Sequence, residues 1–196
     1  MPGLNPEQYA LLAELQAASD AYLDSLADAW AAGEISLAEY QQLFKQELKD
    51  LYLATAWAVT GDVRAKSPAI YGQIAGTLEG QYTYAAEFFI AIGLGALTLN
   101  QIKARARLYV AAGRQVAEGS AMTDGGLPEL PHYPADGSTP CGSNDKCTLR
   151  IDSVENGFDI YWTLHPAEHC GVCIARANGS PLRVRYGAIL NPEAWP

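Results

Sequence analysis

Residues 141–173 read CGSNDKCTLRIDSVENGFDIYWTLHPAEHCGVC, and they mark the change from a helical sequence to a cysteine-bearing one. Within them, two runs with strand character, 147–155 and 158–164, flank the dipeptide Asn156-Gly157. This dipeptide is the strongest short signal for a β-hairpin, because a type I′ turn needs positive φ at both central residues. A turn at these residues would pair Cys147 with Pro166 and so place Cys147 at the open end of the hairpin.

The four cysteines of the chain surround this open end. Cys141 and Cys147 come before or at the start of the first strand, and Cys170 and Cys173 follow the second. The layout is that of a zinc ribbon, and Cys-x2-Cys is the spacing of a metal knuckle. Four thiolates leave no coordination position open, so we expect a structural zinc ion held by Cys141, Cys147, Cys170 and Cys173. Such an ion would stabilise a module too small to bury its own core.

The same residues allow other chemistry. The thiols could form two local disulfides or stay free. Disulfides are disfavoured because the N-terminal residues lack the basic and then apolar segments of a secretory signal. His165 or His169 could replace one cysteine as a ligand, whereas His132 is interpreted as a linker residue.

Upstream of this stretch the sequence is helical in character. Residues 1–122 are rich in Ala, Leu, Gln and Glu, have apolar residues at helical spacing, and contain neither Cys nor His. Start signals predict about four helices, beginning at Pro6, after Ser36, near Pro68 and behind Thr98. A Gly- and Pro-rich linker at 123–140 separates this body from a cysteine module at 141–196. We therefore predict a mainly α protein, a helical body followed by a small zinc-ribbon-like hairpin.

Two of the predicted helices carry distinctive side-chain patterns. The third contains Gly72, Gly76 and Gly80, each costing about 1 kcal/mol of helix stability relative to Ala, which indicates tight backbone packing against a neighbour. The fourth carries four basic residues, which form either a solvated face or a docking stripe. The acidic first helix could be the partner of that stripe, within the chain or between subunits. The basic residues are Lys103, Arg105, Arg107 and Arg114.

The composition narrows the classes of function. Of the 196 residues 49% are hydrophobic and 18% charged, which suits a chain that buries a core. The net charge of -9 argues against nucleic-acid binding and against docking on anionic lipid, and no apolar run is long enough to span a bilayer. The common motifs of hydrolases, phosphate-binding loops, zinc peptidases and dinucleotide folds are absent from the sequence. We therefore predict that the protein is not an enzyme and has no catalytic residues.

The residues around the first cysteine pair resemble a known family. The run LPHYPADGST at 130–139, followed by Cys141, Asn144 and KCTL at 146–149, is similar to the C-terminal part of tailed-bacteriophage minor head proteins of the phage Mu type. The segments 168–173 and 181–185 are similar to related phage sequences, so the resemblance covers about residues 128–190. The family carries the first cysteine of a Cys-x-Cys pair where this chain has Asp145, so Asp145 is either a substitute ligand or has no part in the site.

The resemblance implies a structural role in a virion. Minor head proteins of this type associate with the portal or the inner capsid and assist head assembly. This implies the portal or major capsid protein as partners, and a virion or phage-derived particle assembled in the bacterial cytoplasm as the location. The alternative is a zinc-ribbon adaptor or regulatory protein that binds a protein partner through hairpin residues such as Arg150, Tyr161 and Trp162.

The predicted third helix also bears on self-association. Its large side chains between residues 82 and 92 cannot all face one core at 100° per residue. Either the other helices cover this helix on all sides, or a second copy of the chain covers part of it. We predict a homo-oligomer whose contacts include residues 82–97, with the C-terminal tail around Trp195 as a second contact.

Overall fold

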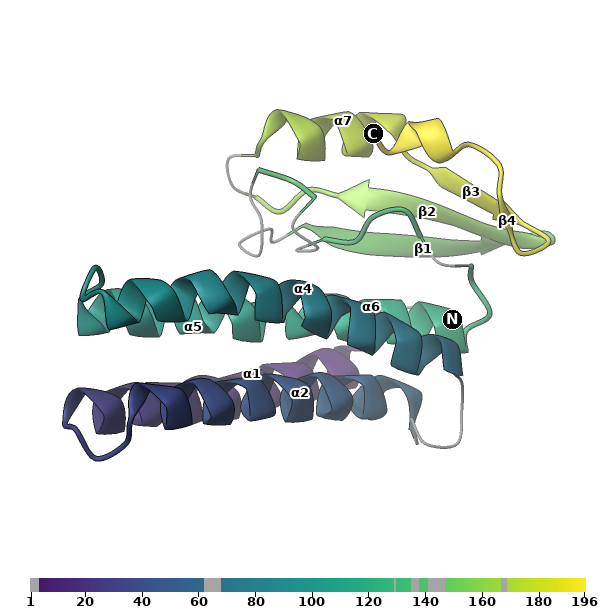
Figure 1. Ribbon diagram of the computed structural model, residues 1–196. Helices are drawn as coiled ribbons and strands as arrows, with labels where there is room; N and C mark the ends of the chain where they lie inside the picture. The colour runs from purple at the N-terminus through teal and green to yellow at the C-terminus, as the bar shows by residue number, and fades with distance from the viewer. Residues whose placement is uncertain (1–3, 62–67, 129, 135–137, 141–146, 167–168) are drawn as a thin grey trace.

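The computed structural model describes residues 4–61, 68–128, 130–134, 138–140, 147–166 and 169–196. Figure 1 shows a helical part with a smaller part, made of a sheet and a short helix, lying over it. The helical part consists of α1 (Pro6–Ala31), α2 (Leu37–Thr60), α4 (Pro68–Gly93), α5 (Leu99–Ala111) and α6 (Gly113–Asp124). The smaller part consists of β1 (Thr148–Val154), β2 (Gly157–Thr163), α7 (Gly171–Gly179), β3 (Leu182–Arg185), β4 (Ala188–Ile189) and a 3-10 turn (Pro192–Ala194). The prediction of a mainly helical protein with a C-terminal hairpin is confirmed.

Capping boxes set the start of three helices. In each box a side chain before the helix accepts the backbone N–H three residues on, and the side chain there accepts the N–H of the cap. The predicted starts at Pro6, after Ser36 and after Thr98 are confirmed, and α4 begins at Pro68 as expected. The pairs are Asn5 with Gln8, Ser36 with Glu39, and Thr98 with Gln101.

The predicted fourth helix is two helices, α5 and α6, joined at Ala112. The backbone N–H of Ala112 closes α5 by bonding to Leu108, and no side chain caps the start of α6. The next residue, Gly113, is a weak helix former, and a Cβ built on it would lie 3.6 Å from Leu51 and Tyr52 of α2, at ordinary van der Waals distance. The break therefore falls where the chain passes close to α2, which hydrophobic spacing alone does not reveal.

Aromatic rings fill the centre of the helical body. Tyr40 and Phe44 of α2 meet Phe88 and Phe89 of α4, with edge-to-face rings such as Tyr40 and Phe89 at 5.1 Å between centroids. Tyr109 of α5 closes the cluster against Phe44, and its backbone carbonyl accepts a hydrogen bond from Tyr52. These rings belong to one hydrophobic core that extends from α1 to the first half of α6.

The sheet is antiparallel in the order β1-β2-β3-β4, and its first hairpin forms with a different register from the predicted one. Val154 pairs with Gly157, so the turn consists of Glu155 and Asn156, and only Asn156 has positive φ (61°). Gly157 is a strand residue, because a Cβ there would lie 1.9 Å from the carbonyl oxygen of Val184 in β3. Its glycine is therefore required by close strand approach rather than by the turn.

The second hydrophobic core lies in the smaller part and includes residues of the linker. Ile160, Trp162, Leu182 and Val184 of the sheet form its centre, and Trp195 packs edge-to-face on Trp162 at 5.4 Å. Trp195 is only 2% exposed, so the predicted role of this residue as a contact between subunits is wrong. Four residues before the hairpin share this core: Met122, Leu127, Leu130 and Tyr133.

Candidate functional site

The open end of the first hairpin is the candidate metal site. β1 starts directly after Cys147, β2 ends at Thr163, and α7 starts directly after Cys170. Figure 1 shows the start of β1, the end of β2 and the first turn of α7 at the same end of the sheet. The revised register leaves Cys147 at this end, one step beyond the Thr148–Thr163 pair.

Cys170 and Cys173 open helix α7 as a knuckle. Cys170 is the N-cap of the helix, and its sulfur accepts a hydrogen bond from the backbone N–H of Cys173 at 3.4 Å. This position places the sulfur beside the backbone N–H groups that open the helix. Cys173 itself is fully buried in the second core, while Cys170 is partly buried against it.

Cys147 is also buried and has two polar neighbours. Its sulfur lies 3.8 Å from Nδ1 of His169, the residue just before the knuckle. Its backbone carbonyl accepts a hydrogen bond of 3.1 Å from the guanidinium of Arg114 on α6. The same guanidinium makes an ion pair of 2.9 Å with Glu118, so a residue of the helical body helps to fix the first residue of the hairpin.

The structure describes three of the four predicted cysteine ligands. Cys141 and Asp145 lie outside the described residues, whereas Cys147, Cys170 and Cys173 lie at the same end of the module. Within the described ranges no group of three or more His, Cys, Asp or Glu side chains is gathered closely enough to hold a metal ion. The four-cysteine site therefore stays a prediction. His165 is exposed, and its backbone carbonyl accepts a hydrogen bond from Nε2 of His169.

Arg176 of α7 is an organising residue that sequence reasoning missed. Its side chain is 1% exposed, stacks over the ring of Trp162 at 4.9 Å, and donates hydrogen bonds to Ser138 and to the backbone oxygen of Pro196. It thereby ties the linker, the hairpin and the C-terminal tail to one helix. Nothing in the sequence distinguishes this arginine from an exposed helix arginine.

The hairpin offers less binding surface than the adaptor hypothesis needs. Trp162 is buried, so it cannot contact a partner as that hypothesis required. Arg150 remains exposed and stacks on Tyr161 at 4.1 Å. Only these two of the three candidate contact residues stay available on the hairpin.

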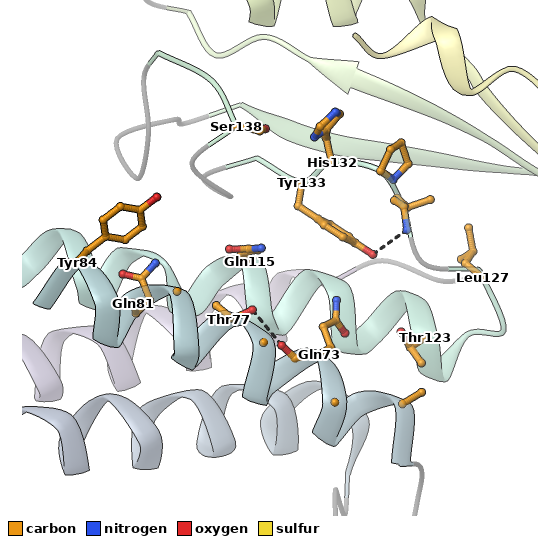
Figure 2. A pocket seen from close by; sticks show the side chains of 16 residues that line it. Gln73, Thr77, Gln81, Tyr84, Gln115, Thr123, Leu127, His132, Tyr133 and Ser138 are labelled. Carbon is orange, nitrogen blue, oxygen red and sulfur yellow. Dashed lines mark hydrogen bonds between the residues drawn. The ribbon is translucent and has the colours of Figure 1, made fainter. Parts of the chain in front are cut away.

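A groove of about 860 Å³ separates α4 from the linker residues. Figure 2 shows Gln73, Thr77 and Gln81 of α4 on one side, and His132 and Tyr133 on the other. The described lining residues carry no carboxylate, lysine, arginine or cysteine, and their polar groups are amides, hydroxyls and the imidazole of His132, all of which can form hydrogen bonds.

The three spaced glycines of α4 lie along this groove and not in a helix contact. A Cβ built on Gly72, Gly76 or Gly80 would meet nothing within 4 Å among the described residues. The prediction of tight packing at these glycines is therefore wrong within the chain. The close approach of α4 and α6 occurs at Gly119 instead, where an added Cβ would clash with Gln73 at 2.0 Å.

Basic residues of α5 contact the acidic first helix of the same chain. Lys103 pairs with Asp28 and Arg107 with Asp24, each at 2.6 Å. Arg105 instead lies over the ring of Phe88 at 5.3 Å. Of the two alternatives for the basic stripe, docking on the acidic first helix therefore applies within the chain to Lys103 and Arg107.

Comparisons with known proteins leave the chain without an assigned relative. Among the described residues, no helix has the length and apolar character needed to cross a membrane. No protein-family model matches the sequence, and neither a curated protein nor a solved structure matches it.

Proposed function

We propose that this chain is a non-enzymatic structural or assembly protein of a phage-type particle, similar to a minor head protein, that associates with itself and carries a structural zinc ion. The observation that carries the proposal is the position of Cys147, Cys170 and Cys173. All three lie at one end of a buried module core, inside the segment that resembles the phage family. In this proposal, residues 141–196 form the zinc module, and 123–140 link it to the body at 1–122.

The zinc part of the proposal rests on the donor set. Spacing assigns Cys141, Cys147, Cys170 and Cys173 as ligands, and a cap sulfur that already accepts a backbone N–H matches the way thiolates are held in structural zinc sites. Zinc would join the loop before β1 to the start of α7 and so close the module. Metal analysis of the purified full chain should give about one zinc per chain. Less than half an equivalent, with disulfides intact by mass spectrometry, would contradict this.

Self-association rests on large side chains that stay exposed on α4 and directly after its end. Phe88 and Phe89 are buried by their own chain, but Tyr84, Ile90 and Leu94 are 62%, 63% and 78% exposed. Ile90 lies in the last turn of α4, and Leu94 follows the helix directly, with its backbone N–H donating a hydrogen bond to the carbonyl of Ile90. The two side chains form an exposed apolar end of the helix that a second copy of the chain would cover.

Light scattering on the full chain tests this contact. We expect an assembly at micromolar concentration, and we expect the double change Ile90→Ser with Leu94→Ser to reduce its mass. Leu190→Ser is the matched control, because Leu190 is 60% exposed but lies far from α4 in the sequence. A stable monomer in the unaltered protein would contradict the proposed self-association.

The assembly role predicts particles, rings or tubes of the purified protein in the electron microscope. Partners would be other virion proteins such as the portal or major capsid protein, and the location a virion or phage-derived particle. The second candidate function is a zinc-ribbon adaptor that binds a protein partner, favoured by the exposed stack of Arg150 on Tyr161. A soluble monomer whose partner binding is lost on Tyr161→Ala would support the adaptor instead.

A further inference from the structure

Three glycines of α4 lie at successive turns without a packing reason inside the described chain. Gly72, Gly76 and Gly80 are exposed, and a Cβ built on any of them would meet nothing within 4 Å. Glycine destabilises the interior of a helix relative to alanine, and residues four apart share one face of the helix. All three line the groove between α4 and the linker. Their lack of side chains therefore widens this groove at a cost to the stability of the helix.

The groove also holds hydrogen-bonding groups that the described part of the chain does not use. The amides of Gln81 and Gln115 and the hydroxyl of Tyr84 line it, and none of them has a side-chain hydrogen bond within the described residues. Oε1 of Gln73, in the same lining, is fully buried and has no partner among those residues either. Figure 2 shows Gln81 and Tyr84 pointing from α4 toward the side of the groove on which the linker lies. Polar groups held away from water are usually paired, so a ligand in this groove would find partners already in position.

The lining also indicates the chemical class of the ligand. Its described residues carry no charged side chain, so they offer no ion pair to an acidic or basic ligand. Side-chain amides both donate and accept hydrogen bonds, as the hydroxyl groups of a sugar do. The ring of Tyr84 is 62% exposed and presents a flat apolar face, on which the C–H face of a sugar ring can lie. The glycines let such a ring come close to the backbone of α4.

A peptide ligand fits this groove less well than a sugar. Extended peptides are recognised by a free sheet edge or by pockets for their side chains, but the backbone groups of α4 are bonded within the helix and its glycines make a flat floor.

We propose that the groove binds a neutral oligosaccharide. Its volume of about 860 Å³ lies within the usual range of ligand sites. From Gly72 to Tyr84 the helix rises about 18 Å, which is room for about three or four sugar residues. In this site Tyr84 stacks on one sugar ring, Gln81 and Gln115 bond to its hydroxyl groups, and the glycines form the floor. The inference goes beyond the proposed function and uses none of the cysteines.

Titration calorimetry on the full-length protein tests the site with maltotetraose, cellotetraose and chitotetraose as neutral probes. We expect at least one of them to bind with a Kd of about 1 mM or tighter. Gly76→Leu should raise the melting temperature by about 2–4 °C, because leucine is the better helix former, and yet weaken binding about tenfold or more by filling the groove. Ala75→Leu is the matched control, because Ala75 is exposed on the same helix but lies outside the groove. It should keep the affinity within about twofold.

Further arms of the titration test the class of ligand. Gln81→Leu should weaken binding of the neutral probe about tenfold while the far-UV circular dichroism stays unchanged, because it removes hydrogen bonds made only to the ligand. A galacturonic acid tetramer should bind at least about tenfold more weakly than the neutral probe, because the described lining holds no cation. The inference is overturned if no neutral tetrasaccharide binds at millimolar concentration, or if Gly76→Leu binds as tightly as the unaltered protein. Binding of a neutral dodecapeptide, but of none of the sugars, would overturn it as well.

Discussion

The helical body and the hairpin module build their cores in different ways. The core of the body comes from long helices whose apolar faces meet around the rings of Phe44, Phe88 and Tyr109. The core of the module comes from strands of at most seven residues and one short helix, and it contains Cys147 and Cys173 among its buried residues. The body can be explained by apolar burial alone, whereas the module places buried cysteine side chains where a larger domain would place Leu or Ile.

The composition of the two cores shows which residues stabilise each region. Every buried residue of the first core lies at or before Val116, so the body needs nothing from the module to complete it. The second core borrows Met122 from the end of α6 and Leu127, Leu130 and Tyr133 from the linker. The module therefore depends on residues of the body and the linker and, in our proposal, on a zinc ion, and the comparison can be tested by removing each support in turn.

The largest effect should come from separating the two regions. A chain that ends at Gly126 should keep its helical circular dichroism, because its core is complete without the module. The complementary fragment, 127–196, should fold only with zinc, which contributes about 10–16 kcal/mol in small metal-dependent peptides. The near-ultraviolet signal of the Trp162–Trp195 pair reports on its folding. Loss of helical signal from the chain ending at Gly126 would show that the two halves are one domain.

The same contrast explains what could be predicted from the sequence. The helix starts follow from local chemistry: Ser36 with Glu39, and Thr98 with Gln101, satisfy backbone groups within four residues of each other. The break at Ala112 could not be predicted in this way, because no side-chain cap marks the start of α6 and the segment that lies close to Gly113 is in α2, some sixty residues earlier in the chain.

In the module, the hairpin could be predicted but its register could not. Asn156-Gly157 indicated a turn, yet Gly157 is needed where β3 approaches β2, and β3 comes more than twenty residues later. The proposed site shows the same limit. Cys147 and the Cys170–Cys173 knuckle could be read from spacing, but the orientation of His169 toward Cys147 depends on a backbone carbonyl that no motif records.

The next largest effect should be confined to the body. Phe44→Ala removes a fully buried ring that contacts four other rings, and it should lower the free energy of unfolding by about 3–5 kcal/mol. Denaturant unfolding followed by far-UV circular dichroism measures the change. Trp57→Ala is the control, because Trp57 is exposed, and it should alter stability by about 0.5 kcal/mol or less. Loss of zinc from a Phe44→Ala protein that remains folded would show that the two regions are more tightly coupled than their separate cores indicate.

A smaller effect is expected at the junction of the regions. Arg114→Leu removes both the ion pair with the buried carboxylate of Glu118 and the hydrogen bond to the carbonyl of Cys147. We expect a loss of about 1–3 kcal/mol, and a weaker zinc affinity because the start of β1 is less firmly held. Arg107→Leu breaks the exposed pair with Asp24 and should cost less than about 1 kcal/mol, with no effect on zinc. Equal losses in the two variants would mean that Arg114 does not connect the body to the module.

The smallest effect is expected at the N-terminal cap of α2, where Ser36 and Glu39 form a capping box. The backbone N–H of Ser36 donates to the carboxylate of Glu39 at 2.8 Å, which holds the pKa of Glu39 below its ordinary value. A carboxyl with a lowered pKa in the folded state stabilises the fold above its unfolded pKa, and this contribution is lost as the pH falls through the folded value. Glu39→Gln keeps the acceptor without the charge, as Gln8 and Gln101 do in the other two boxes. The unaltered protein should therefore melt slightly above the Glu39→Gln variant at pH 7, and the difference should disappear as the pH falls through the lowered pKa of Glu39. The exposed Glu34→Gln is the control, and an identical pH dependence in both variants would exclude a specific role for this cap.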